Sequence, residues 1–134
     1  MKQPNNPLIK EWVNKAEGDF AAATILNKSR SNKKTFYIIA FHCQQAIEKY
    51  LKALLTCHKT DFPKIHDLVE LLNLIKDKDP LLQGIKKELI ILNPFAVGFR
   101  YPGEDIEAKE LKIVIKTARF LRDILIKRIK QCEK

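Results

Sequence analysis

The spacing of apolar residues between about residues 34 and 58 constrains the fold of this chain more than any other feature. Apolar side chains recur there at steps of three and four, at Phe36, Ile39, Ala40, Cys43, Ala46, Ile47, Tyr50, Leu51 and Leu54. Such steps place the side chains on one face of an α-helix. Because this face is unusually broad, we expect a helix that has neighbours packed on more than one side.

Other segments of the sequence show helical spacing as well, and none alternates between apolar and polar residues long enough to predict a strand. Asn6 followed by Pro7 is a helix start signal, because the Asn side chain can cap backbone N–H groups and proline lacks the N–H that would need a partner there. These further helices are expected at about residues 7–28, 65–76, 80–92 and 104–131, with a polar loop at 27–34. We therefore predict an all-α fold, an up-and-down bundle of three long and two short helices.

Length and charge limit the functional classes. The chain has 134 residues, which predicts a single domain over residues 1–134. It carries 25 Lys and Arg against 16 Asp and Glu, a net charge of +9, and such an excess favours RNA, nucleotides or an acidic protein surface as partners. No apolar run approaches the roughly 18 residues of a membrane span, and "MKQPNNPLIKEW" lacks the apolar core of a signal peptide. A cytoplasmic protein without a membrane partner is expected.

Cysteines and histidines give no sign of a cofactor. The three cysteines, Cys43, Cys57 and Cys132, are odd in number and lack a paired CxxC spacing, so we expect all three to be reduced. The three histidines, His42, His58 and His66, are scattered and form no HxxxH or HExxH pair. Neither a metal site nor a cofactor is predicted.

Three groups of polar residues are candidates for binding or catalysis. One is the polar side of the helix at 34–58, which is either solvated or the wall of a site. The second is "FRYPGED", where Arg100 can grip phosphate through two N–H groups and Tyr101 can stack on a base. The third is a row of cations in the last helix, a solvated face or a phosphate-binding stripe, at Lys109, Lys112, Lys116, Arg119, Lys127 and Lys130. Glu104 and Asp105 are expected at the start of that helix, where negative charge is favourable.

Four segments together resemble a known family. "HCQQAIEKYLKALL" is followed by "FPKIHDLVELL" and then by "FRYP", and "WVNKAEGDFAAATILN" has Ala16, Asp19 and Ala23 in register with the opening helix of that family. In this order and spacing they resemble the HEPN domain, a bundle of four or five helices. The resemblance covers almost the whole chain.

The resemblance implies a function in two-part systems. HEPN domains are commonly encoded beside small nucleotidyltransferases, form homodimers, and many are metal-independent ribonucleases of toxin-antitoxin and defence systems. The ribonuclease subset carries an Arg followed, after four to six residues, by a His. Arg100 would need a His at positions 105–107, which hold Asp105, Ile106 and Glu107, and no Arg stands at the required distance before any of the histidines.

The resemblance therefore favours a non-catalytic subunit that binds a nucleotide or RNA phosphates and acts with a separate nucleotidyltransferase. It implies a groove at or beside a homodimer interface, lined by Gln45, Glu48, Lys49, Lys52, Arg100 and Tyr101. His66 and Asp67 would brace the bundle or support this site. A ribonuclease with a rearranged site and a structural adaptor remain the alternatives.

Overall fold

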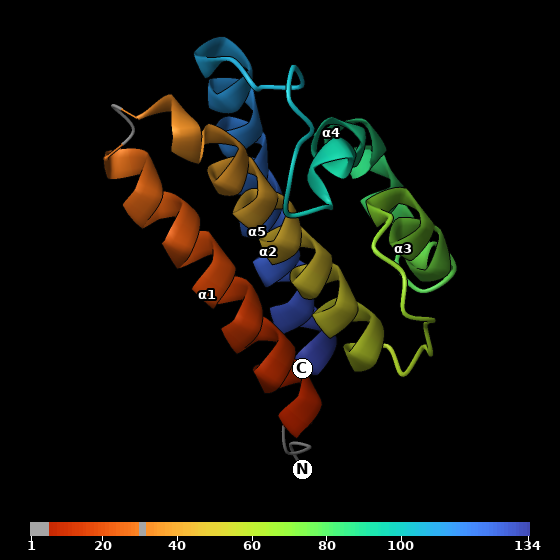
Figure 1. Ribbon diagram of the computed structural model, residues 1–134. Coiled ribbons are helices and arrows are strands. Elements are labelled where there is room, and N and C mark those ends of the chain that lie inside the picture. The colour runs from red at the N-terminus through yellow and green to blue at the C-terminus, as the bar shows by residue number, and fades with distance from the viewer. Residues whose placement is uncertain (1–5, 30–31) are drawn as a thin grey trace.

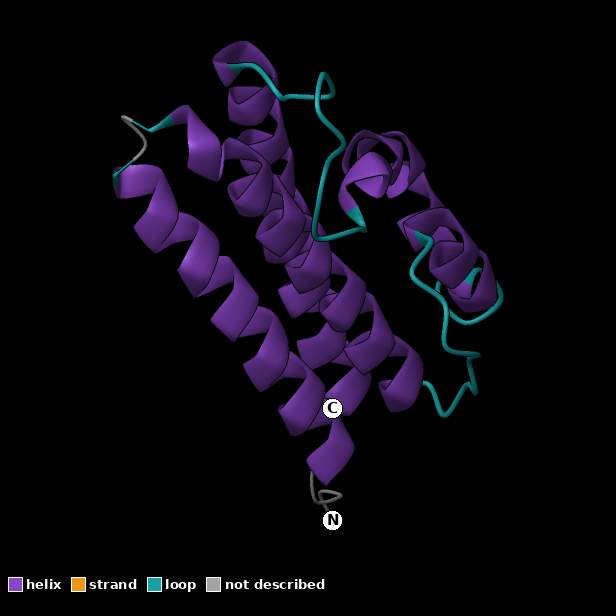
Figure 2. Ribbon diagram, viewed as in Figure 1, coloured by secondary structure: helices purple, strands orange, loops and turns teal. Residues whose placement is uncertain are grey.

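A computed structural model describes residues 6–29 and 32–134, and every regular element in these residues is a helix (Figure 1, Figure 2). The all-α prediction is confirmed. The long helices are α1 (Pro7–Lys28), α2 (Phe36–Cys57) and α5 (Ala108–Glu133), and the short ones are α3 (Leu68–Ile75) and α4 (Lys86–Leu92). Short 3₁₀ segments adjoin the helices: η1 (Lys33–Thr35) precedes α2, η2 (Pro80–Ile85) precedes α4 and η3 (Asn93–Phe95) follows α4.

Helix α2 is the centre of the bundle. Both α1 and α5 pack along it, and α3 covers a further side (Figure 1). α1 runs antiparallel to α2, whereas α5 runs parallel to it, because the chain returns through α3 and α4 before α5 begins (Figure 1). The broad apolar face therefore packs on several sides as expected, and Ile39, Ile47 and Leu51 are fully buried. Burying each such side chain stabilises the fold by about 1.5–3 kcal/mol.

The start of α1 agrees with its sequence signal. The Asn6 Oδ1 accepts a hydrogen bond from the N–H of Leu8 at 2.8 Å, and Pro7 occupies the first helical position. Helix α1 ends at Lys28, as predicted. Residues 1–5 of the N-terminal segment and residues 30–31 of the predicted loop lie outside the described residues.

Three predicted boundaries were wrong, each because of local chain chemistry. α3 begins at Leu68 and not near residue 65, because Asp67 is its N-cap. The segment Pro80–Ile85 is 3₁₀, so the α-helical part of the fourth element begins only at Lys86.

The last helix begins at Ala108 and not near residue 104. Before it, the Glu104 side chain accepts a hydrogen bond from the N–H of Tyr101 at 3.2 Å, and Gly103 has a φ of +92°, a conformation that favours glycine. This turn keeps the chain off a helical path, so Glu104 and Asp105 do not lie in the first turn of α5.

Charged side chains fasten α5 to distant parts of the chain. Arg122 donates to both carboxylate oxygens of Glu17 on α1, at 3.0 and 2.9 Å. Arg128 donates two hydrogen bonds of 2.7 Å to the buried carboxylate of Asp79. Paired bonds of this kind are strong and fix the orientation of the guanidinium.

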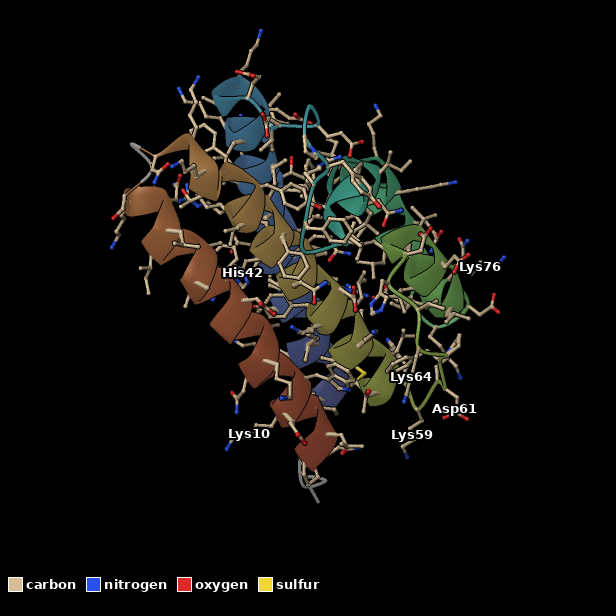
Figure 3. All side chains as sticks on the ribbon, viewed as in Figure 1. Lys10, His42, Lys59, Asp61, Lys64 and Lys76 are labelled. Atoms are coloured by element: carbon tan, nitrogen blue, oxygen red, sulfur yellow. A yellow bond between two sulfur atoms is a disulfide. The ribbon has the colours of Figure 1, made fainter. Side chains whose placement is uncertain are left out.

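The prediction that all cysteines are reduced was wrong. Cys57 and Cys132 form a disulfide between the ends of α2 and α5, which lie together because the two helices are parallel (Figure 3). The Nδ1 of His58 lies 3.7 Å from the Sγ of Cys132. Cys43 is free, and burial raises its pKa to about 12, so its thiol is protonated at neutral pH.

No helix among the described residues is both long and apolar enough to cross a membrane.

Candidate functional site

Two predicted site residues of α2, Gln45 and Lys52, form a hydrogen-bonded group around Glu48. Its carboxylate, almost completely buried, accepts hydrogen bonds from the Nζ of Lys52 at 2.9 Å and from the Nδ1 of His66 at 3.0 Å. The side-chain amides of Gln44 and Gln45 donate longer bonds to it, at 3.4 and 3.5 Å. Because an ionised carboxylate only accepts, the Nδ1 of His66 is the donor in this bond, and its Nε2 is not bound to Glu48. We call Gln44, Gln45, Glu48, Lys52 and His66 the Glu48 cluster.

Aromatic rings cover the ammonium group of Lys52. Its Nζ lies 5.6 Å from the centre of the Trp12 ring and 6.0 Å from that of Phe62. Cation–π attraction adds to the ion pair with Glu48 at this partly desolvated position. The charges of Glu48 and Lys52 thus compensate each other inside the bundle.

A second group lies at the junction of α1 and α2. The Nδ1 of His42 lies 2.9 Å from the Oδ1 of Asp19, and Lys49 donates to the Oδ2 of the same carboxylate. Figure 3 shows His42 between the two helices. Lys49 therefore binds α1 and is not part of the Glu48 cluster.

Arg100 is held between two aromatic rings in the loop before α5. Its guanidinium carbon lies 4.8 Å from the centre of the Tyr37 ring and 5.1 Å from that of Phe95. Its Nε is buried, and no hydrogen-bond partner for it exists in the described part of the chain. Tyr37 donates its hydroxyl to the carbonyl of Val97, and burial is the main cause that raises the pKa of Tyr37. The Tyr37 hydroxyl is therefore protonated at neutral pH and can fix the loop.

Tyr101 is mostly exposed. Its ring packs edge-on against Phe99, with 5.5 Å between the ring centres.

Comparison with known proteins decides the family. The family model described as the HEPN domain matches residues 9–129, which include every helix of the bundle almost completely. The chain belongs to the HEPN family. No curated protein and no solved structure matched it. Membership places the protein among domains associated with nucleotides and RNA.

In this HEPN domain, one face of α2 connects Arg100 with the Glu48 cluster. Tyr37, Phe41, Gln44 and Glu48 follow one another at three- and four-residue steps and therefore share that face. A Cβ at Gly98 would lie 3.6 Å from the Phe41 ring, so the loop passes directly over the helix there. From Tyr37 to Glu48 the helix rises about 16 Å. Arg100 thus lies at one end of this face, and Glu48 and Lys52 lie at the other, whereas Lys49 lies outside it.

Asp67 caps α3 and is itself held by Asn93. Its Oδ1 accepts hydrogen bonds from the N–H groups of Val69 and Glu70 and from the Nδ2 of Asn93. Burial alone would raise the pKa of Asp67, but the hydrogen bonds from Asn93, Glu70 and Val69 outweigh it and lower that pKa. Asn93 also accepts a bond from the N–H of Leu68 at 2.9 Å, which joins the end of α4 to the start of α3.

Several residues that build the site were missing from the predicted set. Gln44 lies inside the bundle and donates to the carbonyl of His66 at 3.2 Å. Tyr37 and Phe95 enclose Arg100, and Asn93 holds Asp67. The position of Gln44 within "HCQQAIEKYLKALL" is a signal that could have been used, whereas the other contacts join residues far apart in the sequence.

Proposed function

We propose that this HEPN domain is a non-catalytic subunit that binds a nucleotide, or the phosphates of RNA, and acts with a separately encoded nucleotidyltransferase. In this proposal it works as a homodimer in a toxin-antitoxin or defence-type system. The proposal rests on the charge and the fixed position of Arg100. Its charge persists at every physiological pH, aromatic rings fix its position, and no carboxylate within the described residues lies within ion-pair distance of it.

Arg100 and the partly exposed residues of α2 would contact the ligand. A guanidinium held in place can donate paired hydrogen bonds to a phosphate without losing much side-chain entropy. Gln45 is partly exposed and would add an amide donor, whereas Lys49 would add an ammonium donor by exchanging its partner Asp19 for a phosphate. Tyr101 would stack on a base or brace the loop. Glu48 and Lys52, which neutralise each other, would position Gln45 and His66.

The proposal assigns no catalysis because the required pair of proton-transfer groups is missing at the expected place. Metal-independent cleavage of RNA needs an acceptor for the 2′-hydroxyl proton and a donor for the leaving oxygen. Positions 105–107 hold no histidine, and the guanidinium of Arg100 stays protonated and cannot act as a base.

One observation favours the ribonuclease alternative. The exposed ring of His66 is oriented by the buried carboxylate of Glu48, an arrangement that leaves Nε2 free to accept a proton. If this pair is catalytic, the purified protein cuts single-stranded RNA in the presence of EDTA and His66→Ala abolishes the cleavage. The proposal expects no cleavage.

Titration calorimetry with ATP and GTP tests the binding site. We expect triphosphates to bind more tightly than nucleosides, and Arg100→Ala to weaken binding about tenfold or more, because a charge-assisted hydrogen bond contributes about 1.5–3 kcal/mol. Lys86→Ala, which removes an exposed charge from α4, is the matched control and should bind like the unmodified protein.

Light scattering on the unmodified protein should give about twice the chain mass of 15.5 kDa, as expected for a homodimer. Arg100→Ala should give the same mass, because a loop arginine is not expected to hold the dimer together. Absence of binding heat with both nucleotides, or equal heat with Arg100→Ala, would favour the structural adaptor over the nucleotide-binding subunit.

A further inference from the structure

A surface pocket lies between the end of α1 and the first half of α5. It has a volume of about 370 Å³ and is lined by Asn27 of α1 and by Lys112, Ile115, Lys116 and Arg119 of α5. Both helices pack along α2 (Figure 1). The three cations stand at steps of four and three residues, so they project from one side of α5.

Four cations elsewhere in the bundle are paired, whereas the three cations of the pocket are not paired with any carboxylate of the described residues. Arg122, Arg128, Lys49 and Lys52 each pair with a carboxylate. Lys112, Lys116 and Arg119 are exposed, and no carboxylate in residues 6–29 and 32–134 lies within ion-pair distance of them. A group of like charges without counter-ions attracts anions, and its N–H donors are free to bind them.

Asn27 supplies a second, independent observation. Its Oδ1 is buried and has no hydrogen-bond partner within the described part of the chain. Because this oxygen is covered, an anion in the pocket would meet the other end of the amide, the Nδ2, which donates. An anion with several oxygens would accept hydrogen bonds from this amide and from the three cations together.

The geometry of α5 suits a chain of phosphates better than a single one. From Lys112 to Arg119 the helix rises about 10 Å, which is longer than a single phosphate group, so the three cations can reach more than one phosphate of a strand. Lys109 extends the row toward the start of the helix. Phe120 follows Arg119 directly and is half exposed, so an aromatic face is available beside the cations. Cations along a groove with an exposed aromatic ring are the features that bind single strands without sequence preference.

We propose that this pocket binds single-stranded nucleic acid, with Lys112, Lys116 and Arg119 on successive phosphates and Phe120 stacked on a base. The site is separate from the nucleotide site at Arg100 and does not depend on it. It gives the row of cations in the last helix a function beyond that of a solvated face.

Fluorescence anisotropy with a fluorescein-labelled oligouridylate of about 15 nucleotides tests the proposal. In the triple variant Lys112→Ala/Lys116→Ala/Arg119→Ala, the affinity should fall at least about tenfold at low salt. The slope of log K against log salt concentration should become shallower by about 2, since each phosphate contact on a single strand contributes about 0.7. The control is Lys76→Ala/Lys86→Ala/Lys87→Ala, which removes the same charge from exposed positions near α3 and α4 and should retain most of the affinity.

Three further variants separate the contribution of stacking from that of charge, and the pocket from the site at Arg100. Phe120→Ala should weaken binding while the salt slope stays the same, and Phe120→Tyr should bind like the unmodified protein. Arg100→Ala should weaken oligonucleotide binding less than the pocket variant does, because any RNA phosphate at Arg100 is bound outside the pocket. Equal losses in the two triple variants, unchanged binding in the pocket variant, or no binding by the unmodified protein would each overturn the proposal. A loss with Arg100→Ala but not with the pocket variant would also overturn it and would leave the nucleotide site standing.

Discussion

The carboxylate of Glu48 and the ammonium of Lys52 lie together inside the bundle, where each is the other's counter-ion. Bringing both charges out of water is costly, and their attraction offsets this cost only while both are present. The amides of Gln44 and Gln45 and the ring of His66 occupy the remaining acceptor positions of the carboxylate. The role of Glu48 is therefore to hold the side chains of Lys52, His66 and the two glutamines in place.

Removal of the Glu48 carboxylate should be strongly destabilising. We expect Glu48→Ala to lower the free energy of unfolding by about 3–5 kcal/mol, because the Lys52 ammonium is left buried without a counter-ion. Adding Lys52→Met should recover part of the loss, since the apolar side chain fits beside Trp12 and Phe62. Urea unfolding of both single variants and the double variant measures this coupling. Additive losses would show that the pair does not act as a unit.

At the scale of elements, the periodic parts of the sequence predicted the structure well. The apolar spacing at residues 34–58 indicated both the helix α2 and its central position, because that spacing reports directly on burial. The boundary of α3 was missed because Ile65 and His66 continue an apolar and polar pattern up to a capping residue, and periodicity does not reveal where a cap lies. The start of α5 was missed because the turn at Tyr101–Glu104 interrupts the helical path, and periodicity does not reveal such a turn either.

The contacts that assemble the site were beyond the reach of one sequence. The spacing of residues 42 and 49 places both on one side of α2, but it does not indicate that Asp19 of α1 faces them. The sequence suggested Arg100 as a candidate site residue, whereas its enclosure by Tyr37 and Phe95 depends on how the loop crosses α2. Such contacts follow from the packing of elements and not from local pattern.

The N-cap of α3 should make a measurable, pH-dependent contribution to stability. Asp67→Ala should lower the free energy of unfolding by about 0.5–2 kcal/mol at neutral pH. Because folding lowers the pKa of Asp67, its contribution is fully present above its ordinary pKa of 3.8 and is lost as the pH falls through the lower pKa of the folded protein. Chemical unfolding of both proteins at neutral pH and in strong acid measures the difference. Asp77→Ala, at an exposed position outside the cap, is the control; a deficit in Asp67→Ala that is the same at both pH values would contradict the role of the charge.

At the scale of the whole molecule, the disulfide joins the two parallel helices at the end where both stop. Its partners are separated by 75 positions, so the bond restricts the unfolded chain severely. Disulfides persist in oxidising surroundings and are rare in the cytosol of most organisms. The stability of this HEPN domain should therefore depend on the redox conditions in which it is measured.

Loss of the bond should lower the free energy of unfolding by about 2–5 kcal/mol. The expected result is that Cys132→Ser and Cys57→Ser unfold at lower temperature than the unmodified protein, and that dithiothreitol lowers the melting temperature of the unmodified protein alone. Differential scanning calorimetry with and without the reductant checks this. A melting temperature that dithiothreitol leaves unchanged in the unmodified protein would show that the bond does not stabilise it.

The same bond closes residues 57–132 into a covalent ring that contains α3, α4 and nearly all of α5. A protease that cut the exposed loop before α5 would therefore open the ring without releasing a fragment. The nicked chain would migrate as one species on a non-reducing gel and as two after reduction. Because α5 would stay tethered beside α2, the two pieces would behave as a single cooperative unit, and damage in that loop would be tolerated for as long as the bond survived.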